Sequence, residues 1–165
     1  MKKREKNKMV ARCRVHVAGY GKNLKLQYQL LFLCFAEYFI IVLCMKNYRD
    51  LDIYQIAFDL AVRVHKASIK LPKFELFEQG SQIRRSSKSI KDQIAEGYGR
   101  RRYKADYIKF LIYSHSSCDE TTSQLEMLII LYPEESEFQT LIKEYEILGR
   151  KINNYIEYVE NNWRT

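Results

Sequence analysis

Proline and cysteine are scarce in this sequence, and both shortages limit what the chain can be. Only two of the 165 residues are proline, Pro72 and Pro133, so long stretches on either side of them are free to form uninterrupted helices. Three of the four cysteines lie in the first 44 residues, and the spacing of the four matches neither a zinc site nor a disulfide framework. This cysteine usage favours a reduced, cytoplasmic setting.

Signatures of catalysis and of cofactor binding are also scarce. Gly97 and Gly99 follow a helical pattern, whereas a phosphate-binding loop follows a strand and needs a third glycine. His115 and Asp119 are four residues apart, but the Glu-x-x-His repeat of di-iron bundles is absent. Cys118 stands one turn from His115, yet a thiol in the middle of a helix is more often a small core residue. We therefore expect no metal, no cofactor and no catalytic residues.

Positive charge is distributed unevenly along the chain. Residues 1–44 hold nine Lys and Arg against two acidic residues, a net charge of +7, whereas residues 45–165 hold nineteen against eighteen, a net charge of +1. Within this second part, residues 45–109 carry fifteen basic and eight acidic residues, and residues 110–165 carry four and ten. The second part is therefore basic in its first half and acidic in its second half.

The first 44 residues look unrelated to the rest. Leu26–Met45 is apolar with one charge, Glu37, and is about as long as a membrane crossing requires. It is a membrane anchor, an additional helix packed on the domain, or the product of a reading frame extended upstream of a native start at Met45. We favour the start at Met45, because a Glu at the bilayer centre costs about 2–3 kcal/mol. Contact with a membrane is accordingly not expected.

Residues 45–165 predict one all-α domain. Apolar residues recur at three- and four-residue steps over about Leu51–Leu71, Phe77–Tyr98, Tyr103–Leu131 and Ser136–Asn162. Both prolines fall between these stretches, and Gly97 and Gly99 offer left-handed positions that end the second one. No stretch alternates with period two for long enough to predict a strand. Short joins between the helices predict an up-down-up-down antiparallel four-helix bundle.

Small polar residues in the third helix predict a close approach of a neighbouring helix. Ser114, Ser116 and Ser117 lie at its middle, and their hydroxyls are expected to bond back to their own helix.

The chain also holds thirteen tyrosines. A tyrosine ring can be buried while its hydroxyl stays in contact with water, which suits a subunit interface.

Eight cations between residues 84 and 104 are the candidates for contact with nucleic acid. Three of them fall on one face of the second helix, and only Asp92 and Glu96 oppose the eight within this run. Such a row suits the phosphates of RNA or DNA. Equally open is pairing with the acids of the fourth helix, within one chain or across an assembly. The candidates are Arg84, Arg85, Lys88, Lys91, Arg100, Arg101, Arg102 and Lys104.

Glu96 is expected to form a structural salt bridge. It lies in the last turn of the second predicted helix, where the helix macrodipole disfavours an anion. A nearby guanidinium compensates this cost, and the arginines at 100–102 and 84–85 are within reach. A structural role for this carboxylate is therefore preferred over a catalytic one.

Several motifs in this arrangement resemble a known family. They are Gln82 with Arg84 and Arg85, the string Ile94-Ala95-Glu96-Gly97-Tyr98-Gly99-Arg100, Asp106–Leu111, and Ser117 with Glu120. Over about Tyr48–Tyr158 the chain thereby resembles the bacterial four-helix-bundle family encoded in intervening sequences of 23S ribosomal RNA genes. That family also includes the accessory proteins of diversity-generating retroelements.

The resemblance implies a homopentameric ring with no known enzymatic activity. For the retroelement branch it also implies nucleic-acid binding and contact with a reverse transcriptase, whereas this chain is more similar to the intervening-sequence branch. We therefore expect a non-enzymatic, self-assembling cytoplasmic protein that binds RNA or DNA through its arginine-rich edge. The alternative is an oligomeric scaffold that binds a protein partner, such as a reverse transcriptase, without contacting nucleic acid.

Overall fold

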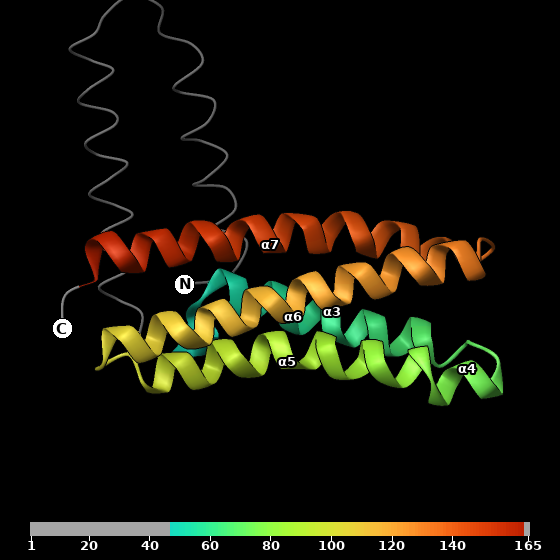
Figure 1. Cartoon of the computed structure of the whole chain (residues 1–165), viewed down its shortest axis with the longest axis horizontal. Helices are drawn as coiled ribbons and strands as arrows, with labels where there is room; N and C mark the ends of the chain where they lie inside the picture. Colours follow the sequence, from blue (N-terminus) through green and yellow to red (C-terminus); the bar gives the residue numbers. More distant parts are fainter. Residues whose placement is uncertain (1–46, 164–165) are drawn as a thin grey trace, which may run out of the picture. The chain divides into compact units, whose positions relative to one another are not determined.

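The structure is a computed structural model, and it describes residues 47–163. The chain divides into two units, Met1–Met45 and Lys46–Thr165, and the described residues belong to the second. They form η1 (Tyr48–Asp50), α3 (Asp52–Ser68), α4 (Lys73–Phe77), α5 (Gln79–Gly99), α6 (Lys104–Leu131) and α7 (Ser136–Asn162), as Figure 1 shows.

The predicted all-α fold with four long helices is confirmed, and residues 47–163 contain no strand. None of the helices in this range has an apolar stretch long enough to cross a bilayer. The interpretations of residues 1–44, including the anchor and the start at Met45, lie outside the described residues.

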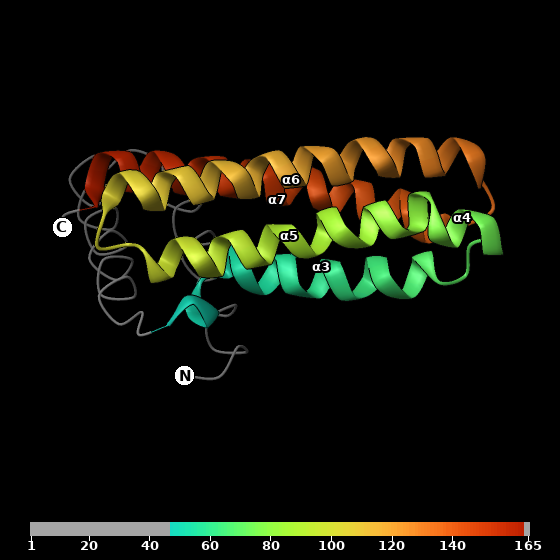
Figure 2. The ribbon, with the colours of Figure 1, turned by 60° about the horizontal axis from the view of Figure 1, so that its bottom comes forward.

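The four long helices each pack against two neighbours. α5 lies between α3 and α6, and α7 closes the bundle between α6 and α3 (Figure 2). α3 and α6 therefore occupy opposite corners, and so do α5 and α7. At one end, the ammonium of Lys104 donates to the carbonyl of Glu160 at 2.6 Å. At the other end, the hydroxyl of Tyr132, which follows α6, donates to Glu75 of α4 at 3.2 Å.

The core consists largely of the apolar stripes expected from the sequence. Burying an aliphatic or aromatic side chain contributes about 1.5–3 kcal/mol, so these stripes supply the main force that holds the helices together. Ile56, Phe110 and Tyr155, which follow the same three- and four-residue spacing of apolar residues, are only half-buried. The residues that are buried as predicted include Leu60, Val64, Ile83, Ile90, Ile94, Tyr107, Leu125, Leu128, Phe138, Leu141, Tyr145, Leu148, Ile152 and Val159.

A row of small hydroxyl residues joins α5 to α6. Ser114 donates to the carbonyl of Ile90 at 3.1 Å, and the hydroxyls of Ser117 and Ser89 are 3.1 Å apart. The predicted bonds from these two α6 serines back to their own helix are wrong, because both hydroxyls cross to α5. Such hydroxyls find partners there only because the two helix backbones lie close together.

Gly97 has a different role from the one predicted. α5 continues through Gly97 and Gly99, neither glycine has a positive φ, and Arg100 follows at φ −95°. The prediction that these glycines end the helix in a left-handed conformation is therefore wrong. A Cβ at position 97 would lie 2.8 Å from the Cβ of Phe110 on α6, whereas a Cβ at position 99 would meet nothing within 4 Å. Gly97 is needed for the close approach of α6.

The start of the second long helix also differs from the prediction. Instead of one helix from about Phe77, the short α4 precedes a break at Glu78, where φ is −89° and ψ is −104°. The buried carboxylate of Glu75 accepts the backbone N–H of Gln79 at 3.3 Å across this break. Its other oxygen accepts the Tyr132 hydroxyl, so a single acidic side chain connects α4, α5 and the end of α6.

The close contact at Gly97 gives a direct test of the α5–α6 packing. Gly97→Ala should lower the free energy of unfolding by about 1–3 kcal/mol, because the new methyl group overpacks the contact with Phe110. Gly99→Ala is the matched control and should be neutral or slightly stabilising, since its surroundings are open. Urea unfolding followed by circular dichroism measures both. Equal effects of the two substitutions would contradict the role assigned to Gly97.

Candidate nucleic-acid interface

The eight predicted cations lie along α5, the turn that follows it and the start of α6. Four lie on α5, Arg100–Arg102 form the turn that follows, and Lys104 begins α6. From Arg84 to Arg100 the helix rises about 24 Å, at about 1.5 Å per residue. Ile83, Ile90 and Ile94 are fully buried and define the inner face of α5. The cations therefore lie on the flanks and on the outer face of this helix. The structure divides these eight residues into two groups.

Arg84 belongs to the interior rather than to the cationic edge. Its guanidinium donates to the carbonyl of Leu76 at 2.8 Å and to the hydroxyl of Ser68 at 3.2 Å. These bonds connect α5 to α4 and to the end of α3, and they occupy two of the five N–H donors of the guanidinium. Arg84 therefore has a structural role at this joint, and its contact with nucleic acid stays a prediction.

Four more of the eight cations have partners within the chain. Arg101 donates to the backbone carbonyl of Tyr98 at 2.9 Å, and its guanidinium lies 4.1 Å from the centre of the Tyr98 ring. Lys104 donates to the carbonyl of Glu160, and Lys91 pairs with its neighbour Asp92. The fourth, Arg100, pairs with Glu96. Each of these groups exchanges an existing contact when it binds a phosphate, which reduces its net contribution.

The salt bridge expected at Glu96 is present in the structure. Arg100 donates to a carboxylate oxygen of Glu96 at 3.0 Å, four residues earlier on the helix, and both side chains are about half exposed. The guanidinium of Arg100 also lies 4.9 Å from the ring centre of Phe110. The pair therefore spans the end of α5 beside the Gly97 contact. Its contribution to stability stays a prediction.

Arg85, Lys88 and Arg102 form the available part of the edge. All three side chains are exposed, and none has a hydrogen-bond or ion-pair partner within residues 47–163. Arg85 and Lys88 are three residues apart and share the outer face of α5, on which Asp92 and Glu96 also lie. The outer face of α5 is therefore basic at its start and acidic toward its end, and Arg102 follows beyond the acidic part.

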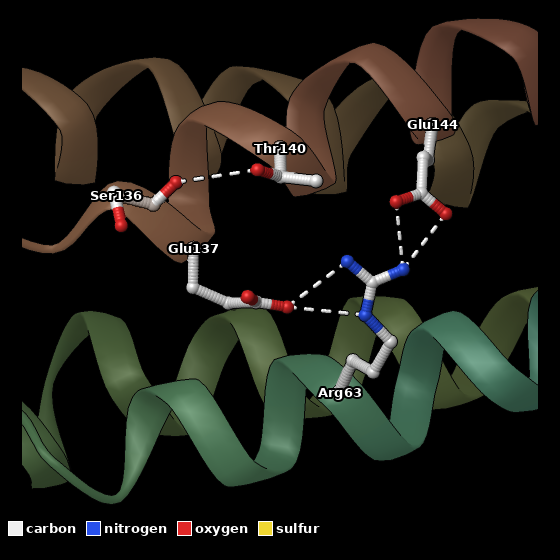
Figure 3. Close-up of polar contacts among 5 residues, drawn as sticks. All are labelled: Arg63, Ser136, Glu137, Thr140 and Glu144. Carbon is white, nitrogen blue, oxygen red and sulfur yellow. Dashed lines mark hydrogen bonds and ion pairs between the residues drawn. The ribbon is translucent and has the colours of Figure 1, made fainter.

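The acids of α7 pair with a residue that the sequence had not singled out. Arg63 of α3 donates from one nitrogen to both carboxylate oxygens of Glu144, at 2.7 and 2.8 Å, and from two others to Glu137, at 3.0 and 3.1 Å (Figure 3). Hydrogen bonding to Glu144 raises the pKa of Arg63, although partial burial opposes the shift. Within residues 47–163, the two α7 acids that form ion pairs therefore pair with α3 and not with the cations of α5.

The sequence contained only an indirect signal for the role of Arg63. Glu137 and Glu144 are seven residues apart and so share one face of the fourth predicted helix, which indicated a site for a cation. The identity of that cation depends on which helix packs beside this face, and four helices offer more than one choice. Only the packing of α3 against α7 selects Arg63.

Residues that resembled catalytic groups have structural surroundings. His115, which is partly buried, lies 3.2 Å from the exposed Asp119 along α6, and residues 47–163 contain no cluster of His, Cys, Asp or Glu able to hold a metal. The thiol of Cys118 is buried and donates to the carbonyl of Tyr145 at 3.4 Å. Burial raises the pKa of Cys118 to about 12, so this thiol is not an activated nucleophile.

The model of the 23S rRNA-intervening sequence protein family matches residues 49–154. Because the match covers well over half of the chain, this chain belongs to that family, and the predicted resemblance is confirmed. All eight candidate cations lie within the matched residues. No curated protein matches the chain.

Substitution of two neighbouring arginines distinguishes a cation with a structural role from one that is available to a ligand. Arg84→Ala should lower the free energy of unfolding by about 1–3 kcal/mol, because it leaves the Leu76 carbonyl without its donor. Arg85→Ala removes the same charge from an exposed position and should change stability by no more than about 0.5 kcal/mol. Thermal and urea unfolding of both variants measures the difference. Equal stabilities would show that the bonds of Arg84 do not hold the joint.

Proposed function

We propose that this chain is a non-enzymatic, self-assembling bundle that binds RNA or DNA through Arg85, Lys88 and Arg102. The observation that carries the proposal is the exposure of these three cations without a partner in the described range. Arg and Lys side chains of this kind gain most from phosphates, because binding displaces no existing ion pair. A cytoplasmic location fits the same proposal and rests on the cysteine usage of the sequence.

The acids on the same face set the expected strength of binding. Asp92 and Glu96 lie between Lys88 and Arg102 and repel a phosphate backbone that follows the helix. Three free cations give a weak contact, since each neutralised phosphate contributes only a salt-sensitive increment. Several copies held in one assembly bind a long nucleic acid much more tightly than one copy does. Self-assembly is therefore part of the proposed function.

The surface of α6 supports self-assembly. Large apolar side chains that gather on an exposed face mark an interaction surface, and α6 keeps several of them on its outer surface. Their exposed fractions range from 44% to 79%. We propose an up-down-up-down antiparallel bundle as the building unit and a ring of five such units as the assembly, as the family resemblance implies. The exposed residues are Ile112, Tyr113, Met127, Ile130 and Leu131.

A second candidate function is a scaffold that binds a protein partner, such as a polymerase, without nucleic acid. The observation that favours it is the exposure of two aromatic rings on α4, Phe74 at 67% and Phe77 at 71%. Exposed aromatic side chains are typical anchors of protein interfaces. This surface lies at the far end of the bundle from Arg102, so the two functions use different residues and different tests.

Removing the three available cations together tests nucleic-acid binding. The variant Arg85→Ala, Lys88→Ala, Arg102→Ala should lose most of its affinity for a short RNA. The slope of log K against log salt should become shallower by about 2–3, at about 0.7–0.9 per phosphate contact. Fluorescence anisotropy at several salt concentrations gives both quantities, with a matching DNA duplex as a second probe.

A variant with the same loss of charge on α7 provides the control. Lys143→Ala, Arg150→Ala, Lys151→Ala also removes three exposed cations, so it changes the net charge equally. It should retain the affinity of the wild type within about threefold and keep the salt slope. Equal losses of RNA affinity in both triple variants would show that binding depends on the overall charge rather than on Arg85, Lys88 and Arg102. Wild-type protein without salt-dependent binding would favour the protein scaffold instead.

A further inference from the structure

The outer face of α3 carries an apolar stripe that nothing in the described structure covers. Phe58, Val62 and Ile69 are separated by steps of four and seven residues, which places them on one side of the helix. Their exposed fractions are 49%, 39% and 54%. The opposite side of α3 holds the buried Leu60 and Val64, so the stripe points away from the core.

The outer face of α6 carries a second stripe. Ile112, Met127 and Ile130 lie on one side of this helix and are 46%, 49% and 79% exposed. Ser116 and Ser123 lie between them on the same face and are exposed as well. Small residues at these two positions allow another helix to approach closely between the larger side chains.

The two stripes lie on opposite corners of the bundle. α3 and α6 are each packed between α5 and α7 and do not pack against one another. Neither stripe can cover the other within one copy, and each is built from different residues. Two different surfaces on one chain are what head-to-tail association requires, because each copy then offers one face to each neighbour.

Charge next to the stripes selects the pairing of α3 with α6. Residues 60–73 contain no Asp or Glu, and residues 110–131 contain no Lys or Arg. Beside the later part of the α3 stripe stands the exposed Lys66, with the exposed Asp59 nearer the start of the stripe, and beside the α6 stripe stand Asp119 and Glu126, also exposed. The last turns of both helices lie at the end of the bundle where Tyr132 contacts Glu75. Basic and acidic parts therefore face each other when two copies stand side by side in the same direction.

We infer that the α3 stripe of one copy packs on the α6 stripe of the next copy, with the two bundles parallel and each copy rotated relative to the last, so that the row closes into the proposed ring. This inference rests on the proposed self-assembly and names the two faces that form it. Because α5 and α7 are the remaining corners, every copy then presents α5 on one side of the assembly and α7 on the other. Arg85 and Lys88 of all copies line one side, and the α7 acids line the opposite side.

Mixing two defective variants tests the pairing. Phe58→Glu disrupts the α3 face and places an anion opposite acidic residues of the neighbouring copy. Ile130→Lys disrupts the α6 face and places a cation opposite basic residues of the neighbouring copy. Each full-length variant alone should remain a single copy in light scattering at concentrations where the wild type assembles. Mixed in equal amounts, they should form a dimer and nothing larger, because each brings one intact and complementary face.

Ile147 provides the matched control. It lies on α7, outside both stripes, with 47% of its surface exposed, and Ile147→Glu or Ile147→Lys should assemble like the wild type. Circular dichroism confirms that every variant is folded. A dimer formed by either defective variant alone, or a mixture that stays as single copies, overturns the α3–α6 pairing. A wild type that never assembles overturns the proposed self-assembly as well, whereas an assembling wild type with unaffected variants overturns only the pairing.

Exchange of charges tests the parallel register. Lys66→Glu should raise the dissociation constant of the assembly about tenfold, which corresponds to about 1.4 kcal/mol per interface. Glu126→Lys in the same chain should restore assembly, because the attraction between the two positions returns with reversed signs. A double variant that assembles no better than the single variant contradicts the parallel arrangement.

Discussion

The close packing of α5 against α6 is the constraint on which the rest of the bundle depends. Gly97 leaves the space that the Cβ of Phe110 occupies, and serine hydroxyls bond directly between the two helices. Since α5 runs on to Gly99 without a left-handed residue, this packing determines where the arginine turn leaves the bundle. It also fixes which side of α6 faces inward, and so leaves the apolar outer face of α6 uncovered.

Much of the fold could be predicted from the sequence, because helical periodicity is a local property. The fourth helix was expected over Ser136–Asn162 and has these bounds in the structure. The role of Gly97 was missed, because a glycine near a helix end is equally consistent with a residue that ends the helix and with one that allows close packing of a second helix. Only the tertiary packing distinguishes the two roles. The break at Glu78 was missed for the same reason, because it is held by Glu75 and by Tyr132 from α6.

The candidate site could be predicted only as a set of residues. Sequence spacing shows which cations share a face of α5, but it does not show which of them fold back onto the protein. Arg84 reaches a carbonyl on α4 and Arg101, in the turn after α5, reaches one near the end of α5, while Arg85, beside Arg84, reaches neither. Pairing of the α7 acids with the basic half of the chain was one of two open alternatives, and two of these acids do pair with it, through Arg63 rather than through α5.

The proposed functions combine into one design, in which we propose that a bundle uses two corners to bind its neighbours and a third to present cations. A weak site of three cations becomes useful only when several copies hold it in a row, so assembly and binding depend on each other. Native mass spectrometry of the full chain, with and without a short RNA, tests this most directly. The account predicts one species of five copies that retains bound RNA. Single copies under both conditions would contradict it.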